Sequence, residues 1–315
     1  MSCYKPRILI VCDYPDSVYD RVSDGFINEI NNLFEIEKIY TVHDPIIEHS
    51  RYDVIYLMWW RSKIWEEFYI PKNKLCIYVA SFWSWQEKFK TPLPELAAQY
   101  LSHAHSVSVN CPGLFNLISP HHPNVFMNPG GVDINKFSSQ PPRSTNNSEP
   151  LMVGWAGSES GHDYKKGYRE IIVPACTNLH GVELVSRVLE INPISHNDMP
   201  DFYKSIDVYI CASISEGTPN PVLEAAASSR AIVSTPVGIV PMLIDDEYNG
   251  FIIDRSISQL REKLTVLRDN RELCVRMGCR NRLKIEIDGW SWKNRAIGYA
   301  EMFSKMITDG KAISI

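Results

Sequence analysis

Two glutamates separated by a tight turn are the residues in this sequence best suited to chemistry. Glu216 and Glu224 stand eight positions apart, and between them lies Gly-Thr-Pro-Asn-Pro, a sequence that favours a turn. We expect Asn220 to cap a helix that has Pro221 in its first position, which places Glu224 one turn inside that helix. Because helical side chains tilt toward the N-terminus of their helix, the carboxylate of Glu224 can reach a ligand bound there.

The start of this predicted helix has the chemistry to bind an anion and hydroxyl groups. The backbone N–H groups of residues 218–222 and the partial positive charge of the helix end suit a phosphate. A carboxylate beside them accepts hydrogen bonds from sugar hydroxyls. The simpler alternative is that Glu224 only stabilises the helix start through the helix dipole. For the two glutamates taken alone, this simpler alternative is favoured.

The sequence around the two glutamates resembles the retaining glycosyltransferases of family 4, which have the GT-B fold. The signature of that family is Glu-x7-Glu, followed by a strand and a glycine-containing turn. The matching pieces here are Glu216…Glu224, residues 231–235 and Pro236-Val237-Gly238.

Other segments extend this resemblance. Residues 153–157 with Lys166-Gly167 resemble the family's phosphate-binding strand and loop. The further pieces that fit are residues 128–137, Asn249-Gly250-Phe251 and Ser291-Trp292. The resemblance covers about residues 128–306, whereas the first 127 residues fit only by the order of their strands.

The resemblance implies a donor site on the second domain. Glu216 and Lys166 are the expected catalytic residues, with Glu216 at the donor sugar and Lys166 on the diphosphate, where it stabilises the leaving group. Glu224 is expected to hold the ribose of the nucleotide. The other residues expected to bind the donor are Gly157, Ser158, Gly217, Thr218, Pro219 and Asn220.

Two positions depart from the family's pattern. Ser158 stands where the family usually has arginine, so one of two cations expected on the diphosphate is missing. The residues that can replace it are Lys165, Lys166 and Arg187. The family's first-domain histidine, which meets the donor sugar, has no counterpart in residues 80–84. His196 follows the predicted strand 182–189, near the expected position of the base.

Aromatic and basic residues alternate in the first half of the chain. Five tryptophans lie between positions 59 and 85, interleaved with lysine and arginine. One interpretation is an acceptor-binding surface, with Trp83 and Trp85 as faces for sugar rings or as a belt near anionic lipid. The alternative, favoured for most of these tryptophans, is that they pack in the core.

The composition excludes several classes of protein. The 315 residues are 44% hydrophobic and 22% charged with a formal net charge of −5, which argues against a disordered chain and against a dedicated nucleic-acid binder. No apolar run approaches the ~20 residues that cross a bilayer, and residues 1–17 do not form a signal peptide. The eight cysteines are scattered, which favours a reducing compartment and no metal site. We therefore expect a cytoplasmic protein that can contact a membrane peripherally.

Short apolar strands separated by helix-length segments predict two parallel sheets covered by helices on both faces. The predicted strands are 7–12, 53–58, 75–80 and 106–109, then 151–156, 182–189, 207–212 and 231–235. The predicted helices are 24–33, 168–177, 221–229, 255–270, 269–285 and 290–307.

The polar stretch 138–150 predicts a linker between two domains. With the resemblance, this predicts the α/β GT-B fold: two Rossmann-like domains, 1–140 and 150–289, whose parallel sheets face each other across a cleft. The final helix, 290–307, is expected to pack back on the first domain.

The function that the resemblance implies is that of a retaining, metal-independent hexosyltransferase. The expected donor is a nucleoside diphosphate sugar, with UDP favoured over GDP, and it is a substrate, so no cofactor is expected. The acceptor is an unidentified glycan, lipid-linked compound or small molecule, and nucleic acid is not an expected partner. The alternatives are another GT-B enzyme, such as a sugar-nucleotide epimerase, and a non-catalytic subunit that binds the nucleotide sugar.

Overall fold

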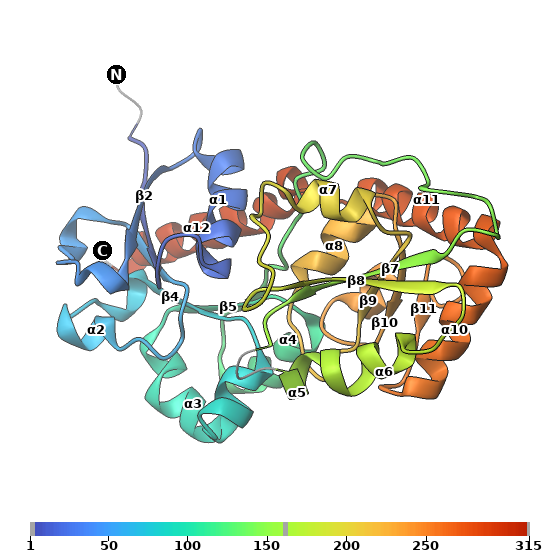
Figure 1. Cartoon of the computed structure of the whole chain (residues 1–315). Coiled ribbons are helices and arrows are strands. Elements are labelled where there is room, and N and C mark those ends of the chain that lie inside the picture. Colours follow the sequence, from blue (N-terminus) through green and yellow to red (C-terminus); the bar gives the residue numbers. More distant parts are fainter. Residues whose placement is uncertain (1–3, 160–162, 314–315) are drawn as a thin grey trace. The chain divides into compact units, whose positions relative to one another are not determined.

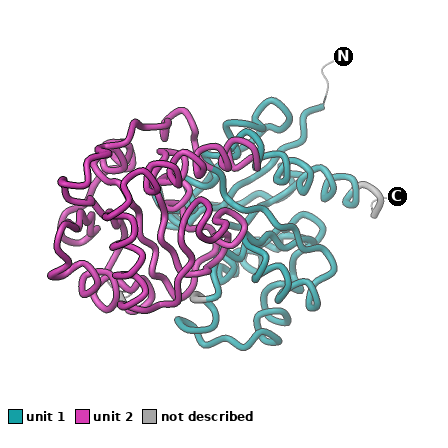
Figure 2. Tube along the Cα trace, turned by 90° about the vertical axis from the view of Figure 1, so that its right-hand side faces the viewer, with its two compact units in different colours: residues 1–131, 292–315 teal, residues 132–291 magenta. Residues whose placement is uncertain are grey.

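Two compact α/β units make up the chain. The computed structural model describes residues 4–159 and 163–313, with side chains for all of these except residues 83, 84, 163 and 311–313. Unit 1 comprises residues 1–131 and 292–315, and unit 2 comprises residues 132–291, as the two colours of Figure 2 show. Each unit is built on one parallel sheet, which agrees with the predicted pair of Rossmann-like domains.

The sheet of unit 1 has the strand order β2-β1-β3-β4-β5-β6, and all its described pairings are parallel. Its strands are β1 (Arg7–Cys12), β2 (Glu35–Tyr40), β3 (Val54–Leu57), β4 (Leu75–Val79), β5 (Ser106–Val109) and β6 (Val125–Met127). The four predicted strands are the buried central ones. The two strands that the sequence analysis did not predict, β2 and β6, lie at the edges, where their side chains are partly exposed.

The helices of unit 1 pack on this sheet (Figure 1). They are α1 (Val18–Ile30), α2 (Ile64–Glu67), α3 (Leu93–Gln99), α4 (Pro112–Ile118) and α12 (Trp292–Ile313). Short 3-10 or π turns are η1 (Thr41–His43), η2 (His49–Arg51), η3 (Lys72–Lys74), η4 (Trp83–Lys88), η5 (Leu101–His103) and η6 (Ser119–His121).

The first helix begins earlier than the predicted 24–33. The hydroxyl of Ser17 accepts a hydrogen bond from the N–H of Asp20 at 3.1 Å, so Ser17 caps the helix and Val18 is its first residue.

The final helix belongs to the core of unit 1. Its residues Tyr299, Met302 and Phe303 join the buried cluster of β1, β3 and β4. Gly25 in α1 allows the close approach of α12, because a Cβ there would lie 2.1 Å from the ring of Trp292. Packing against Trp292 therefore explains why α1 contains glycine, which has a low helix propensity, at position 25.

The sheet of unit 2 has the strand order β11-β10-β9-β7-β8, also parallel. Its strands are β7 (Leu151–Gly157), β8 (Val182–Val188), β9 (Val208–Cys211), β10 (Ala231–Ser234) and β11 (Phe251–Ile252). Its helices are α5 (Asp163–Lys166), η7 (Tyr168–Ile172), α6 (Val173–Cys176), α7 (Met199–Lys204), α8 (Asn220–Ala227), α9 (Val240–Leu243), α10 (Ile257–Asp269) and α11 (Arg271–Ile287).

Helices cover both faces of the unit 2 sheet, as the predicted architecture requires. Val153 on β7 packs in the same buried cluster as Ala175 of α6. The neighbouring Gly154 faces the other way, since a Cβ there would meet Ile206 and Phe202 next to and within α7. Figure 1 shows α6 and α7 on opposite sides of the strands.

The two compact units divide between residues 131 and 132, before the polar stretch 138–150 that the sequence predicts as a linker. The polar stretch is bound to unit 2 by arginines. Arg230, 2% exposed, donates to the backbone oxygens of Gln140 and Pro141 at 2.9 Å. Arg143 donates to the carboxylate of Asp207 at 3.2 Å. A segment without an apolar core residue is thus fixed by part-buried hydrogen bonds that its own composition does not reveal.

Candidate active site

The predicted catalytic residues meet at the carboxyl ends of the unit 2 strands, where parallel α/β sheets bind ligands. Glu216 lies in the loop after β9, and Lys166 is the last residue of α5, which follows β7. The ammonium of Lys166 donates to Oε1 of Glu216 at 2.5 Å, and the hydroxyl of Ser213 donates to the same oxygen at 2.8 Å. Fifty positions of sequence separate the two residues of this ion pair.

Backbone contacts hold Lys166 at this position. Gly167 has φ +68°, and a Cβ there would lie 2.7 Å from the backbone oxygen of Ala212. The N–H of Ile214 donates to the oxygen of Lys165 at 2.9 Å. Arg255 spans the two segments, donating to Ala212 at 3.2 Å and to the backbone oxygen of Tyr164 at 2.6 Å. The Lys-Gly sequence is therefore required by close packing against the loop that carries Glu216.

A second glycine turn supports the Glu216 loop. Gly238 has φ +55°, and a Cβ there would lie 1.9 Å from the backbone oxygen of Gly217. The N–H of Ile239 donates to that same oxygen at 3.1 Å. The predicted turn 236–238 therefore lies directly against Glu216 and Gly217, which gives a physical reason for the order of these sequence pieces.

The charged side chains at this site favour the binding of an anion. Glu216 is 9% exposed; this burial raises the pKa of its carboxyl, but the charges of Lys166 and Lys165 outweigh it, so the net pKa lies below the ordinary value. Burial lowers the pKa of Lys166, yet the neighbouring Glu216 carboxylate raises it overall. Burial also lowers the pKa of Lys165, which is the more enclosed of the two lysines. Two lysines facing one carboxylate can attract a negatively charged group such as a diphosphate.

Glu224 forms a second cluster in the same unit. It lies in α8 and is 8% exposed. Its Oε2 accepts from the hydroxyl of Tyr203 at 2.7 Å, and its Oε1 lies 3.1 Å from Nε2 of His196. Burial and the Glu224 carboxylate raise the pKa of Tyr203 well above its ordinary value, so its hydroxyl remains a donor. Nδ1 of His196 lies 3.0 Å from the ammonium of Lys136.

Two members of this cluster, Tyr203 and Lys136, are not among the site residues predicted from the sequence. Lys136 lies within the segment 128–137 that the resemblance covers, but nothing in its spacing indicates a partner 60 positions away. Tyr203 is a helix residue with no local motif around it. Only the tertiary structure brings Tyr203 to the Glu224 carboxylate and Lys136 to the His196 ring that contacts it.

The start of α8 differs from the predicted cap. The helix begins at Asn220, Pro219 occupies the capping position, and no side chain accepts a capping hydrogen bond. Pro219 and Pro221 have no N–H to donate, and the N–H of Val222 donates to the oxygen of Pro219 at 2.9 Å. The turn therefore offers fewer backbone donors to a phosphate than predicted, because prolines occupy two of the five positions.

A carboxylate binds the predicted phosphate loop. Gly157 ends β7, and Ser158 follows it. The hydroxyl of Ser158 donates to Oε1 of Glu190, and the N–H of Glu159 donates to Oε2 of the same carboxylate at 2.9 Å. The groups predicted to meet the diphosphate thus already bind an anionic side chain, one that is exposed to solvent.

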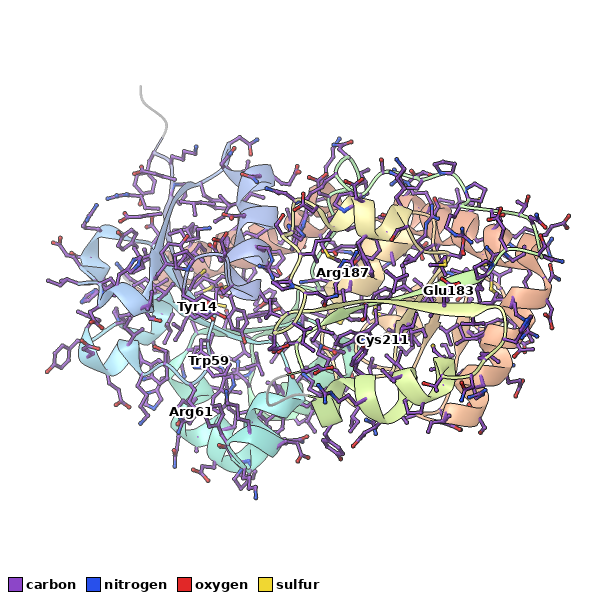
Figure 3. The ribbon with its side chains drawn as sticks, viewed as in Figure 1. Tyr14, Trp59, Arg61, Glu183, Arg187 and Cys211 are labelled. Atoms are coloured by element: carbon purple, nitrogen blue, oxygen red, sulfur yellow. The ribbon has the colours of Figure 1, made fainter. Side chains whose placement is uncertain are left out.

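Arg187 stands beside this loop. On β8 it is paired in register with Ala156 of β7, and Figure 3 labels it there. Its guanidinium lies 5.8 Å from the ring of Phe202, and no carboxylate among the described residues forms an ion pair with it. Of the cations suggested as substitutes for the missing arginine, it is the one that has no acidic partner in the described part of the chain.

The structure separates the tryptophans into two groups. Trp85 is 1% exposed, so its ring is not presented to an acceptor, and the packing alternative holds for it. The side chain of Trp83 lies outside the described residues. Trp59 is half-buried and Arg61 is exposed. Both follow β3 and are labelled in Figure 3. The guanidinium of Arg61 lies 4.2 Å from the ring centre of Phe89.

Metal-binding clusters and membrane-spanning helices are both absent from the described residues. No group of three or more histidine, cysteine, aspartate or glutamate side chains among them is arranged to hold a metal ion. Within the same part of the chain, every helix is too short or too polar to span a bilayer.

Comparison with known families identifies one segment of the chain. Residues 179–284 match the family described as glycosyl transferases group 1. The UDP-Gal:alpha-D-GlcNAc-diphosphoundecaprenol alpha-1,3-galactosyltransferase of Escherichia coli is 24% identical over 115 residues, which are 36% of this chain and 29% of that protein. The chain spans between 29% and 53% of the length of the curated relatives it matches.

Solved structures resemble nearly the whole chain. Sucrose-phosphate synthase from Thermosynechococcus elongatus superposes with a TM-score of 0.76 at 12% identity, covering 97% of this chain and 100% of that one. HepE from Anabaena, in complex with UDP-glucose, superposes with a TM-score of 0.74 at 12% identity, covering 95% of this chain and 100% of that one. The chain therefore has the GT-B fold, with two Rossmann-like units.

Proposed function

We propose that this chain is a retaining glycosyltransferase that moves a hexose from a nucleoside diphosphate sugar to an acceptor hydroxyl. The observation that carries this proposal is the ion pair of Lys166 and Glu216, 2.5 Å apart at the carboxyl end of a parallel sheet. Glu224 lies eight positions after Glu216 in the helix that starts beside them. The family match over residues 179–284 supports the assignment, since it contains both glutamates.

Each group has a distinct task in the transfer. The bond between the anomeric carbon and the diphosphate oxygen breaks, and the leaving diphosphate gains negative charge. Lys166 stabilises that charge, which is the largest electrostatic demand of the reaction. The carboxylate of Glu216 accepts hydrogen bonds from donor-sugar hydroxyls, and Glu224 accepts them from the ribose. The acceptor hydroxyl forms the new glycosidic bond on the same face of the sugar, and its proton passes to the departing diphosphate oxygen.

The donor that we propose is a UDP-hexose. The Escherichia coli relative is named for UDP-Gal, and the HepE structure contains UDP-glucose. We further propose that lysine charge neutralises the diphosphate without a required metal ion. Lys166 and Lys165 both lower the pKa of the Glu216 carboxyl, so both charges act at the place where the phosphates would bind. Activity that survives excess EDTA is the expected result.

Titration calorimetry and a donor-hydrolysis assay test the proposal. We expect UDP to bind more tightly than GDP or ADP and to raise the melting temperature. We also expect slow release of hexose from a UDP-hexose without an acceptor, and loss of this release in Glu216→Gln. A chain that binds no nucleoside diphosphate, or that releases no sugar from any donor, would contradict it.

A second candidate is a subunit that binds a nucleotide sugar without transferring it. The observation that favours it is the Glu190 carboxylate on the Ser158 hydroxyl, where the resembled family has a cation. UDP binding with no hydrolysis and no transfer would support this second candidate.

A further inference from the structure

A histidine links a lysine to the carboxylate predicted to hold the ribose. All three residues concerned belong to unit 2. Lys136 lies in the segment before β7, His196 lies in the loop between β8 and α7, and Glu224 lies in α8. The ring of His196 stands between the other two, with Nδ1 3.0 Å from the Lys136 ammonium and Nε2 3.1 Å from Oε1 of Glu224.

The lysine fixes the tautomer of the histidine. An ammonium group has three donors and no lone pair, so it can only donate to Nδ1. Nδ1 of His196 must therefore carry a lone pair, and the ring proton of the neutral imidazole is on Nε2. That proton points at Glu224, which accepts it. The opposite tautomer would place an N–H against the Lys136 ammonium and a lone pair of Nε2 against the Glu224 carboxylate.

Lys136 is itself held in place. Its ammonium also donates to Oδ1 of Asn197 at 3.1 Å. It lies 5.7 Å from the ring centre of Phe137, whose ring packs at 5.5 Å from His196 and at 5.8 Å from Tyr203. The same aromatic ring thus supports both donors to the Glu224 carboxylate.

With two donors in place, the Glu224 carboxylate can accept only a limited number of further hydrogen bonds. Each oxygen of Glu224 has one protein donor, His196 on Oε1 and Tyr203 on Oε2. A carboxylate has about four acceptor positions, so about one remains on each oxygen. Two neighbouring hydroxyls, one for each oxygen, match this capacity.

We propose that Lys136 and His196 are positioning residues that hold Glu224 for the two ribose hydroxyls, so that the site selects ribonucleotides over 2′-deoxyribonucleotides. This inference rests on the proposed function and deepens it. Neither residue needs to touch the nucleotide. Their effect reaches the ligand through the orientation of Glu224.

The test compares UDP with 2′-deoxy-UDP by titration calorimetry. A hydrogen bond to a charged group corresponds to a roughly ten- to hundredfold difference in affinity, which is the preference for UDP that we expect in the wild type. In His196→Ala we expect the ratio of the two affinities to fall to about threefold or less, because Oε1 loses its fixed donor. The affinity for 2′-deoxy-UDP should fall less than that for UDP, because this ligand has only its 3′-hydroxyl contact to lose.

Conservative variants separate positioning from mere stability. In His196→Gln the amide oxygen can accept from Lys136 and the amide nitrogen can donate to Glu224, so most of the preference should return. Lys136→Met should lower the preference and Lys136→Arg should keep it, since a guanidinium also only donates. The matched control is His180→Ala, because His180 is an exposed histidine before β8, at the opposite end of that strand.

The outcomes that overturn the inference are distinct from those that overturn the proposed function. Equal affinity of the wild type for UDP and 2′-deoxy-UDP would refute the inference but not the proposed function. The same holds if His196→Ala keeps the full ratio of the two affinities. Equal weakening of both ligands in His196→Ala, with a lowered melting temperature, indicates a structural role and also refutes it. Wild type that binds neither UDP, GDP nor ADP refutes the proposed function and the inference together.

Discussion

Replacing Lys166 by methionine tests which cation meets the diphosphate. Methionine keeps much of the apolar stem and removes only the charged end. In the structure the ammonium donates to Glu216 at 2.5 Å, and its two other donors can serve a phosphate at the same time. Loss of one charge-assisted hydrogen bond of about 1.5–3 kcal/mol weakens binding roughly ten- to hundredfold. We therefore expect the affinity for UDP to fall by that factor.

The assay must separate phosphate binding from binding of the nucleoside. We expect Lys166→Met to weaken UDP strongly, UMP less and uridine hardly at all, when all three are titrated calorimetrically. The matched control is Lys204→Met, which removes an exposed lysine at the end of α7. UDP affinity within about twofold of the wild type, in a folded variant, would refute the reasoning and direct attention to Arg187.

The same variant has a predicted effect on stability. In the wild type the lysines hold the pKa of Glu216 below its ordinary 4.5, against the effect of burial. The folded pKa is thus lower than the unfolded one, so the group stabilises the fold above pH ~4.5, and this contribution is lost as the pH falls through the folded pKa. In Lys166→Met burial is less opposed, so the pKa of Glu216 rises and stability at neutral pH decreases.

The size of this decrease follows from the partners that remain. Breaking a buried ion pair by removing one partner typically costs ~3–5 kcal/mol. Ser213 still donates to Glu216 at 2.8 Å, and Lys165 still lowers its pKa. The Lys166 side chain is also 29% exposed, so water weakens the pair. We expect a loss of about 1–2 kcal/mol in the free energy of unfolding at pH 7, measured by urea denaturation.

Three further variants test other parts of the structure. Glu216→Gln should lower turnover of a UDP-hexose heavily while UDP affinity stays near the wild type; an equal fall in both would contradict its place at the sugar. Gly238→Ala should lose ~1–3 kcal/mol of stability and lower turnover, since its Cβ would lie 1.9 Å from the oxygen of Gly217 and φ is +55°; an unchanged melting temperature would show that this contact is not tight. Trp85→Ala should cost ~3–5 kcal/mol and reduce hydrolysis and transfer in proportion, as a buried ring requires; loss of transfer alone in a stable protein would restore the acceptor interpretation.

The strands that the sequence predicts well are those buried on both faces. Residues 7–12 and 106–109 match β1 and β5 at both ends. In β1, residues 8–12 form a continuous apolar run, as expected for a strand covered on both faces. In β5 the valines alternate with two serines that are buried as well. β2, with the sequence Glu-Ile-Glu-Lys-Ile-Tyr, is partly exposed and carries charges, so its apolar signal is weak. An edge strand is defined by its neighbour more than by its own residues.

The division of the units and the start of α8 both differ from what local composition indicates. Residues 138–150 read as a linker because nothing in them is apolar, yet Arg230 and Asp207 hold them from distant positions. Asn220 is a good capping residue by type, but the helix already begins there after Pro219. For residues 138–150 the cause is contact with distant residues, and for Asn220 it is a shift of the helix start by one residue. Local composition indicates neither.

The candidate site was predictable to the extent that its parts are close in sequence or carried by the resemblance. Glu216 and Glu224 are local to each other, and the Lys166-Gly167 piece came from the resemblance alone. The partners that orient Glu224 were not predictable, because Lys136 reaches His196, and Tyr203 reaches Glu224, only through tertiary packing. Single lysines and tyrosines are common, and no spacing rule distinguishes these two.

The Glu190 carboxylate limits how much affinity for the diphosphate the phosphate loop of the proposed site can supply. Glu190 accepts from both the Ser158 hydroxyl and the Glu159 N–H, so a diphosphate would compete with it for the same donors. Because Glu190 is exposed, it can turn into water at small cost, but the exchange of one anion for another yields little net gain. The cations must then supply most of the affinity for the diphosphate. That requirement falls on Lys166 and Arg187, and it is the reason why a large loss is expected when Lys166 is replaced.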